Sequence, residues 1–193
     1  MEKNVNKQFY VYGFIGSIFN AFDFDFGAGP RYPRASPAYR EFLIRYLQNP
    51  NTAGDYPALD PGKGWQFDAN VGAEYKPINP LRIALDYTKS RLTRNDSRKT
   101  AFDTNIFTLR STYQFTRFIF TRLRADYDSL RSNVSGQFLV GWNPNPGTAF
   151  YVGYNDNFNY NGFSPFTGQL EPRFERNSRT FFIRASYLFR KSF

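Results

Sequence analysis

The sequence predicts an all-β protein: an antiparallel, up-and-down transmembrane β-barrel, closed or part of a larger barrel, with a short helix in its first long loop. Apolar residues recur with period two in eight segments, and the connections between these segments alternate between short and long. Aromatic residues make up 20% of the 193 residues, yet mean hydropathy is −0.58. A polar average with many aromatic residues is typical of strands that face lipid on one side and water on the other. No apolar run approaches the roughly 18 residues of a membrane-spanning helix. We therefore expect one domain, residues 1–193.

The eight predicted strands differ in how cleanly they alternate. The first carries Phe and Tyr on both faces, whereas the fifth sets Ile119 and Leu123 against Arg122 and Arg124. Period-two alternation is the signature of a strand with two unlike faces. The predicted strands are Gln8–Asp25, Trp65–Lys76, Leu81–Leu92, Phe102–Phe115, Phe118–Leu130, Val134–Trp142, Thr148–Phe158 and Thr180–Arg190.

The lengths of the connections indicate the topology. Short connections lie at Pro77–Pro80, Thr116–Arg117 and Asn143–Gly147, and longer ones at Gly27–Gly64, Thr93–Ala101, Ser129–Asn133 and Asn159–Arg179. Short turns on one side and long loops on the other are typical of outer-membrane barrels, in which the short side is periplasmic. Both chain ends are then periplasmic, and the loop at about 27–64 is extracellular. A soluble β-sandwich is the alternative, but it needs no such regular alternation.

The long loop contains a helix signal. Ser36 is a suitable N-cap, Pro37 favours the first helical position, and Asn49-Pro50 ends the run. An amphipathic helix here has two candidate roles: a plug inside the barrel, or packing over its mouth.

Charged residues recur on one predicted face of the strands. A charge on the lipid face costs about 2–4 kcal/mol at mid-membrane, so this face must be the interior. One interpretation is a structural ladder of ion pairs, in which Arg122, Arg124 and Arg184 pair with Asp126, Asp128 and Asp86, and the other is a charged pore lining. Asp126 and Asp128 also resemble a glycosidase carboxylate pair, but charge balance explains them more simply. The predicted interior charges are Arg82, Asp86, Arg110, Arg122, Arg124, Asp126, Asp128 and Arg184.

Aromatic residues gather near the predicted strand ends. Such residues form girdles at the two membrane interfaces. Sugar stacking is the alternative role. The predicted girdle residues are Trp65, Tyr75, Tyr87, Tyr113, Phe115, Tyr127, Trp142, Tyr154, Tyr187 and Phe189.

The composition argues against several other classes of function. The chain has neither histidine nor cysteine. It therefore lacks the Ser–His and Cys–His nucleophile pairs, the usual zinc ligands and the commonest general base. We expect no enzyme activity, no cofactor and no metal. The net charge of +9 could attract nucleic acid, but no nucleic-acid motif accompanies it. We expect no nucleic-acid partner.

Five stretches, Leu59–Gly62, Ala84–Arg91, Ser111–Phe118, Gly141–Tyr154 and Arg179–Phe189, carry a resemblance to a known family. The region from Tyr32 to Phe193 resembles the C-terminal part of uncharacterised bacterial outer-membrane proteins that join a module similar to family 9 carbohydrate-binding domains to a large β-barrel. Members are several times longer, and the module is missing here. The polar start, Met1–Lys7, has no signal-peptide core. Together these features suggest a piece of a longer protein, with a mature form carrying an initiator Met as the alternative.

We therefore expect the C-terminal part of a larger outer-membrane barrel involved in envelope transport or glycan handling. The alternative is a small closed eight-stranded barrel that acts as a surface adhesin or envelope anchor. The expected partners are outer-membrane lipid, lipopolysaccharide and the barrel-assembly machinery, with glycan as a further candidate. The resemblance also implies an assembly signal in the last strand, formed by Tyr187, Phe189 and the terminal Phe193.

We predict that Phe189→Asp lowers the amount of protein inserted in outer membranes, because the charge replaces an apolar residue of this signal. Heat-modifiable mobility on gels measures the inserted fraction. Insertion equal to that of the unmodified chain would argue against the signal.

Overall fold

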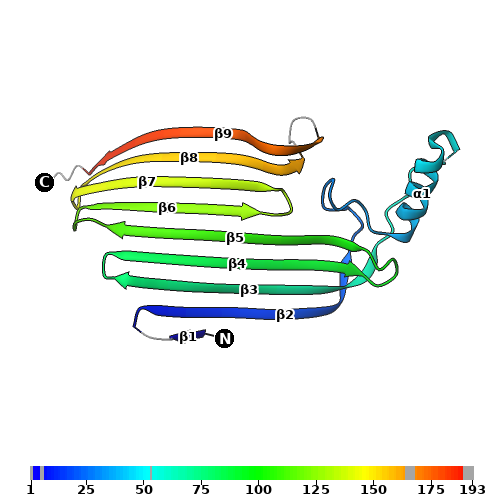
Figure 1. The fold of residues 1–193 in the computed structure, drawn as a ribbon, viewed down its shortest axis with the longest axis horizontal. Helices are drawn as coiled ribbons and strands as arrows, with labels where there is room; N and C mark the ends of the chain where they lie inside the picture. Colours follow the sequence, from blue (N-terminus) through cyan, green and yellow to red (C-terminus); the bar gives the residue numbers. More distant parts are fainter. Residues whose placement is uncertain (1, 5–6, 53, 164–167, 189–193) are drawn as a thin grey trace, which may run out of the picture. The chain divides into compact units, whose positions relative to one another are not determined.

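The computed structural model describes the chain apart from residues 1, 5–6, 53, 164–167 and 189–193 (Figure 1). The described residues are mostly strand, with one α-helix, α1 (Pro37–Gln48), and one short 3₁₀ turn, η1 (Pro50–Thr52). The strands are β1 (Glu2–Asn4), β2 (Phe9–Asp23), β3 (Gly62–Ile78), β4 (Leu81–Arg94), β5 (Thr100–Gln114), β6 (Ile119–Asp128), β7 (Asn133–Asn145), β8 (Thr148–Phe163) and β9 (Leu170–Tyr187). No described helix has the length and apolar character needed to cross a membrane.

The strands form one sheet in which spatial order follows chain order, from β1 to β9 (Figure 1). The predicted all-β, antiparallel, up-and-down arrangement of eight long strands is confirmed. A ninth strand, the three-residue β1, was not predicted; it pairs with β2 only at Tyr10, Val11 and Tyr12. Within the described residues β1 and β9 stand at the two ends of the order, so the sheet is not closed.

One predicted connection is wrong. Most of the expected long loop Asn159–Arg179 is strand, because β8 continues to Phe163 and β9 begins at Leu170. The register from Ser178 to Arg176 skips Asn177, which forms a β-bulge opposite Asn157 and Phe158. A bulge inserts one residue and reverses the alternation beyond it. The period-two pattern of the last strand therefore stops at the bulge although the pairing continues.

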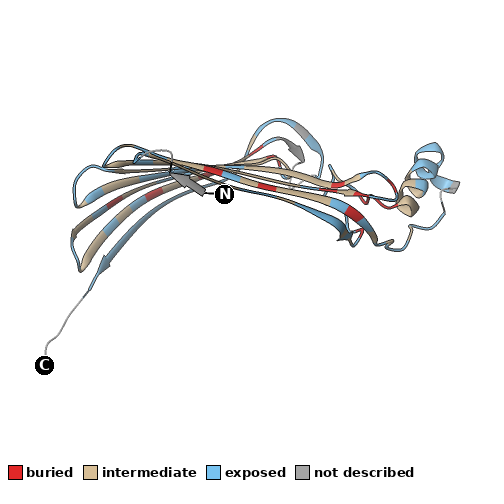
Figure 2. Cartoon of the chain, turned by 90° about the horizontal axis from the view of Figure 1, so that it is seen from below, coloured by how far each residue is buried: buried red, intermediate tan, exposed pale blue. Residues whose placement is uncertain are grey.

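Clustering of backbone contacts divides the chain into two compact units. The first comprises residues 1–13, 71–87 and 106–193, and the second comprises residues 14–70 and 88–105. Buried residues occupy short, separate stretches of the described chain (Figure 2), and Ala35, Leu92 and Ala101 form one small buried cluster in the second unit. Only Ala35, Ala69, Leu92 and Ala101 are buried hydrophobic residues in the described part of the chain.

In the first unit, aromatic rings cover glycines on neighbouring strands. A Cβ atom at Gly141 would overlap the Phe120 ring, and one at Gly153 would overlap the Phe182 ring. Gly72 and Tyr12 make a third such pair. Glycine permits a local bend in a strand, and a cross-strand aromatic ring restores the contact that the missing side chain would make. At each of the three glycines the neighbouring ring fills the space that a side chain would occupy.

The second unit contains the long loop with its predicted helix, and the helix is confirmed. The Ser36 hydroxyl accepts a hydrogen bond from the Tyr39 amide (3.3 Å), and Pro37 occupies the first turn. Such a cap satisfies an amide that has no partner within the helix. Tyr39 and Phe42 pack on Tyr56, with ring centroids 5.9 and 5.4 Å apart. No residue of α1 is buried, and Arg40 Nη1 also donates to the Ser97 carbonyl (3.2 Å).

Arg94, the last residue of β4, is the centre of a buried ion cluster that holds this loop. Only 1% of Arg94 is exposed. Its guanidinium donates to both carboxylate oxygens of Asp96 (3.0 and 2.6 Å), to Asp23 (3.2 Å) and to the Asp60 carbonyl (2.8 Å). These partners come from β2, the end of the long loop and the next loop. A single side chain therefore joins three separate segments.

Asp25 extends this cluster to the start of the long loop. It is fully buried and accepts hydrogen bonds from Arg34 (2.6 Å), the Ser36 amide (3.3 Å) and the Asp60 amide (3.1 Å). Burial alone raises the pKa of Asp25, but these hydrogen bonds outweigh burial and hold the pKa below its usual value. The Arg94 guanidinium likewise lowers the pKa of Asp96. Both groups are therefore ionised at neutral pH, as the cluster requires.

We predict that Arg94→Ala lowers the free energy of unfolding by about 3–5 kcal/mol, because it removes one of the two cations beside the fully buried Asp25 and leaves the Asp23 carboxylate, 12% exposed, without its ion-pair partner. Arg91→Ala is the matched control on the same strand, since the Arg91 side chain is 47% exposed and lies 3.9 Å from its carboxylate partner. Denaturant unfolding of the refolded protein measures both changes. An equal decrease in the free energy of unfolding for the two variants would show that the buried cluster stabilises the fold no more than an exposed ion pair does.

Candidate functional site

The strands β5–β9 have two unlike faces, and the cross-strand register shows which residues share each face. Leu123 lies opposite Ser111 and Phe138, and Val152 lies opposite Val140 and Ile183. We call this the apolar face. Several of its large side chains are exposed, among them Val152 (41%), Leu123 (44%) and Ile183 (70%). The residues between them point to the other side, which we call the arginine face.

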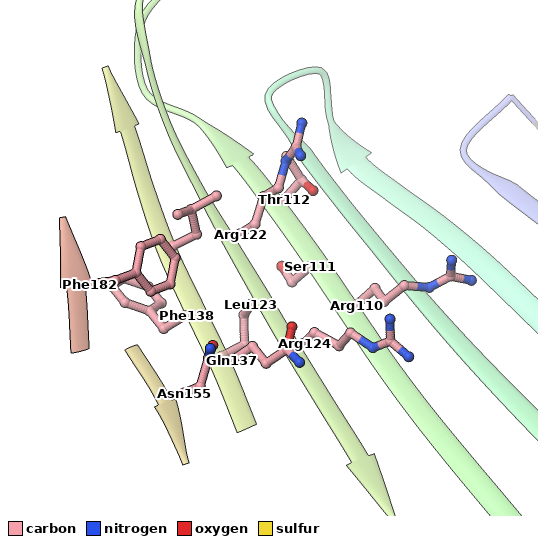
Figure 3. Close-up of a pocket in the computed structure, with 11 residues that line it drawn as sticks. Arg110, Ser111, Thr112, Arg122, Leu123, Arg124, Gln137, Phe138, Asn155 and Phe182 are labelled. Carbon is pink, nitrogen blue, oxygen red and sulfur yellow. The ribbon is translucent and has the colours of Figure 1, made fainter. Parts of the chain in front are cut away.

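The arginine face places like charges directly opposite one another. Arg110 on β5 and Arg124 on β6 are cross-strand partners, and their guanidinium groups extend in the same direction (Figure 3). Like charges opposite each other destabilise a sheet unless each has a counter-charge. Arg110 pairs with Asp86, and Arg124 donates from Nε to Asp126 (2.7 Å). Each arginine therefore has its own carboxylate, which offsets the repulsion between the two guanidinium groups.

The two carboxylates are fixed by further hydrogen bonds. Asp86 accepts a hydrogen bond from the Tyr12 hydroxyl, and Asp126 accepts one from Thr108 (2.7 Å). Tyr12 was not predicted as a site residue. The first predicted strand mixes aromatic residues on both faces, and its sequence gives no sign of which strand it would meet. The contacts of Asp86 join side chains from β2, β4 and β5, and those of Asp126 join side chains from β5 and β6.

Arg122 differs from its neighbours on the arginine face. No carboxylate pairs with it among the described residues, and its guanidinium carbon lies 4.9 Å from the centroid of the Phe120 ring. It lines two hollows of about 400 and 750 Å³. The smaller hollow also presents Gln137, Asn155 and Phe182 (Figure 3). A cation, two amides and an aromatic ring form a surface suited to a polar, anionic solute.

The other predicted interior charges lie in several different contacts. Arg82 pairs with Glu74, and the register places Arg184 opposite Tyr151. Asp128 was expected to pair with an interior arginine, but at the strand end it accepts hydrogen bonds from the Leu130 amide (2.9 Å) and the Arg131 amide (3.4 Å). Of the expected pairings of Arg122, Arg124 and Arg184 with Asp126, Asp128 and Asp86, the structure contains only Arg124–Asp126.

Most of the predicted girdle residues lie in aromatic contacts or at strand ends. Near the short turns, Trp142 stacks on Phe150 (5.3 Å between centroids) and Tyr113 meets Phe115 edge-on (4.6 Å). The remaining residues are placed as follows: Tyr75 contacts Phe9, Tyr87 and Tyr127 flank Phe107, Trp65 donates to Ser17, Tyr154 donates to Asp156, and Tyr187 pairs with Thr148. Phe189 and Phe193 lie outside the described residues.

No group of three acidic, histidine or cysteine residues in the described ranges is arranged to hold a metal ion. Neither a protein-family model nor a curated protein matches the chain.

We predict weak coupling between Arg124 and Asp126, about 0–1 kcal/mol, because the Arg124 side chain is 53% exposed and exposed pairs are screened by water. The thermal midpoints of Arg124→Ala, Asp126→Ala and the double variant in detergent measure it. Coupling of several kcal/mol would mean that the arginine face is dry, and would contradict a water-filled interior.

Proposed function

We propose that this chain is part of an outer-membrane β-barrel, with the apolar face against lipid and the arginine face lining a water-filled interior. The observation that carries the proposal is the separation of exposed apolar side chains from arginines on opposite faces of the same strands. An exposed apolar surface spread over five strands is costly in water. A lipid bilayer removes that cost and forbids charge on the same face.

The strand lengths fit this environment. On the apolar face of β6, residues run from Ile119 to Tyr127. Eight residue steps at about 3.4 Å cover about 27 Å, or about 21 Å across a membrane at a tilt of about 40°. This is close to the apolar band of about 25 Å in outer-membrane barrels. The aromatic pairs near the short turns and around Phe107 correspond to the two interfaces.

The sheet edges favour part of a larger barrel over a small closed one. A strand edge in a membrane must be paired, because lipid offers no hydrogen bonds. A closed eight-stranded barrel needs β9 to pair with β2, but β1 occupies that edge of β2 from Tyr10 to Tyr12. We therefore propose that additional strands of a longer protein complete the barrel, as the family resemblance implies. The adhesin or anchor alternative depends on closure by these eight strands alone.

The arginine face supports transport or handling of polar solutes rather than catalysis. The chain has no histidine or cysteine. The Phe120 and Tyr151 rings, 6.4 Å apart, lie on the arginine face with Gln137 and Asn155, and such rings and amides suit glycans. We propose envelope transport or glycan handling, with lipid, lipopolysaccharide and the assembly machinery as partners and both termini periplasmic.

Because the chain has no cysteine, single cysteines can report which face meets water. We predict that a membrane-impermeant maleimide labels Gln137→Cys but not Phe138→Cys in reconstituted vesicles with the interior open to solvent. The two positions are neighbours on β7, so backbone mobility is matched. After unfolding in detergent, both positions should react.

Equal labelling of the two folded variants would contradict the membrane assignment. A second matched pair on β8, Val152→Cys and Asn155→Cys, guards against one variant that fails to fold.

A further inference from the structure

The β-bulge at Asn177 brings two arginines to one face of β9. Arg176 and Arg179 are three residues apart, so a regular strand would point them to opposite sides. With Asn177 left out of the pairing, Arg179 lies opposite Asp156 and Arg176 opposite Phe158. Asp156 and Phe158 continue the alternate positions of Val152 and Tyr154 on β8. Both arginines therefore lie on the apolar face.

The two arginines share one carboxylate. Arg176 Nε donates to Asp156 Oδ1 (3.0 Å), and Arg179 Nε lies 3.6 Å from Asp156 Oδ2. The Tyr154 hydroxyl also donates to Asp156 (2.6 Å). We call these four residues the Asp156 cluster. Among the described residues neither guanidinium pairs with a second carboxylate, so the cluster keeps one excess positive charge.

The arginines are exposed while the carboxylate between them is not. The side chains of Arg176 and Arg179 are 46% and 52% exposed, whereas that of Asp156 is 10% exposed. Both arginines approach Asp156 through Nε, and no hydrogen bond from a terminal guanidinium nitrogen of either residue is found among the described residues. The rings of Phe158 and Tyr154 lie 5.0 and 5.9 Å from these guanidinium carbons and orient them.

The cluster lies where the aliphatic part of the apolar face ends and a group of aromatic rings, Phe158, Tyr160 and Phe174, begins. On β9 the apolar face carries Tyr187, Ala185, Ile183 and Phe181, and then changes to Arg179. On β8, Asp156 is eight residue steps from Thr148 at the short turn, about 21 Å of depth at the tilt used above. Charges at this depth stand at the interface farther from the short turns, where lipid headgroups lie.

We propose that Arg176 and Arg179 bind the phosphate of a lipid headgroup in the outer leaflet. The inference rests on the proposed function, because only a membrane places a headgroup beside this face. Arginine forks suit phosphate oxygens, with two donors on each guanidinium. The apolar residues directly below the cluster would contact the acyl chains of the same lipid, which a free phosphate lacks.

The test is retention of lipid by the refolded protein in detergent, measured by native mass spectrometry with equimolar phosphatidate and phosphatidylcholine. We expect a preference for phosphatidate of about tenfold, and a loss of that preference in the Arg176→Gln, Arg179→Gln double variant. Arg173→Gln is the matched control, because Arg173 is on the same strand but pairs with Glu175 on the opposite face. It should retain the preference.

Asp156→Asn separates binding from stability. Removal of the carboxylate frees both guanidinium groups, so retention of phosphatidate should rise, whereas a folding defect would lower it. Loss of retention in this variant at an unchanged thermal midpoint would overturn the proposal. Displacement of phosphatidate by inorganic phosphate at the same concentration would overturn the lipid assignment.

The outcome is independent of the cysteine labelling. The expected labelling pattern without a phosphatidate preference would overturn the headgroup site alone. A preference for phosphatidate without the expected cysteine labelling would contradict the barrel assignment. It would still support an anion site at Arg176 and Arg179.

Discussion

Neighbouring side chains on a β-strand point to opposite faces, and the long strands β5–β9 depend on this single geometric rule. It keeps Leu123 and Val152 apart from Arg122 and Arg124 on opposite faces of the same strands. The cost is that like residues meet across strands, as Arg110 and Arg124 do. Hydrogen bonds to Asp86 and Asp126 offset this repulsion. The ion pairs therefore compensate for a consequence of the alternation, and they are not the main source of stability of the sheet.

The local features of this fold follow from sequence because their causes are local. Alternation, the short turns and the Ser36–Pro37 helix start each depend on a few consecutive residues. Contacts between distant strands do not. The Tyr12–Asp86 and Arg110–Asp86 contacts depend on the register between strands, which no single segment encodes. The extension of β8 and β9 was missed for a related reason, because the bulge at Asn177 reverses the phase that the prediction followed.

Arginine has three different environments in this chain. Arg94 is buried and joins three segments, Arg124 is half-exposed and balances one neighbour, and Arg176 lies beside apolar rings at a strand edge. The same guanidinium group therefore contributes very different energies, from several kcal/mol for a buried pair to about 0–1 kcal/mol for an exposed one. Burial, rather than the number of ion pairs, identifies the contact on which the long loop depends.

The buried cluster also determines how the long loop responds to acid. The pKa values of Asp25 and Asp96 are lowered by their hydrogen bonds. A group whose pKa falls on folding stabilises the folded state above its unfolded value, about 3.9 for Asp, and loses this contribution only as pH drops through the folded value. With no histidine in the chain, no side chain has an ordinary pKa between about 5 and 8. The ion pairs that hold the long loop therefore keep the same charge state across the pH range of most natural waters and tissues. A change of pH within that range would not release the loop.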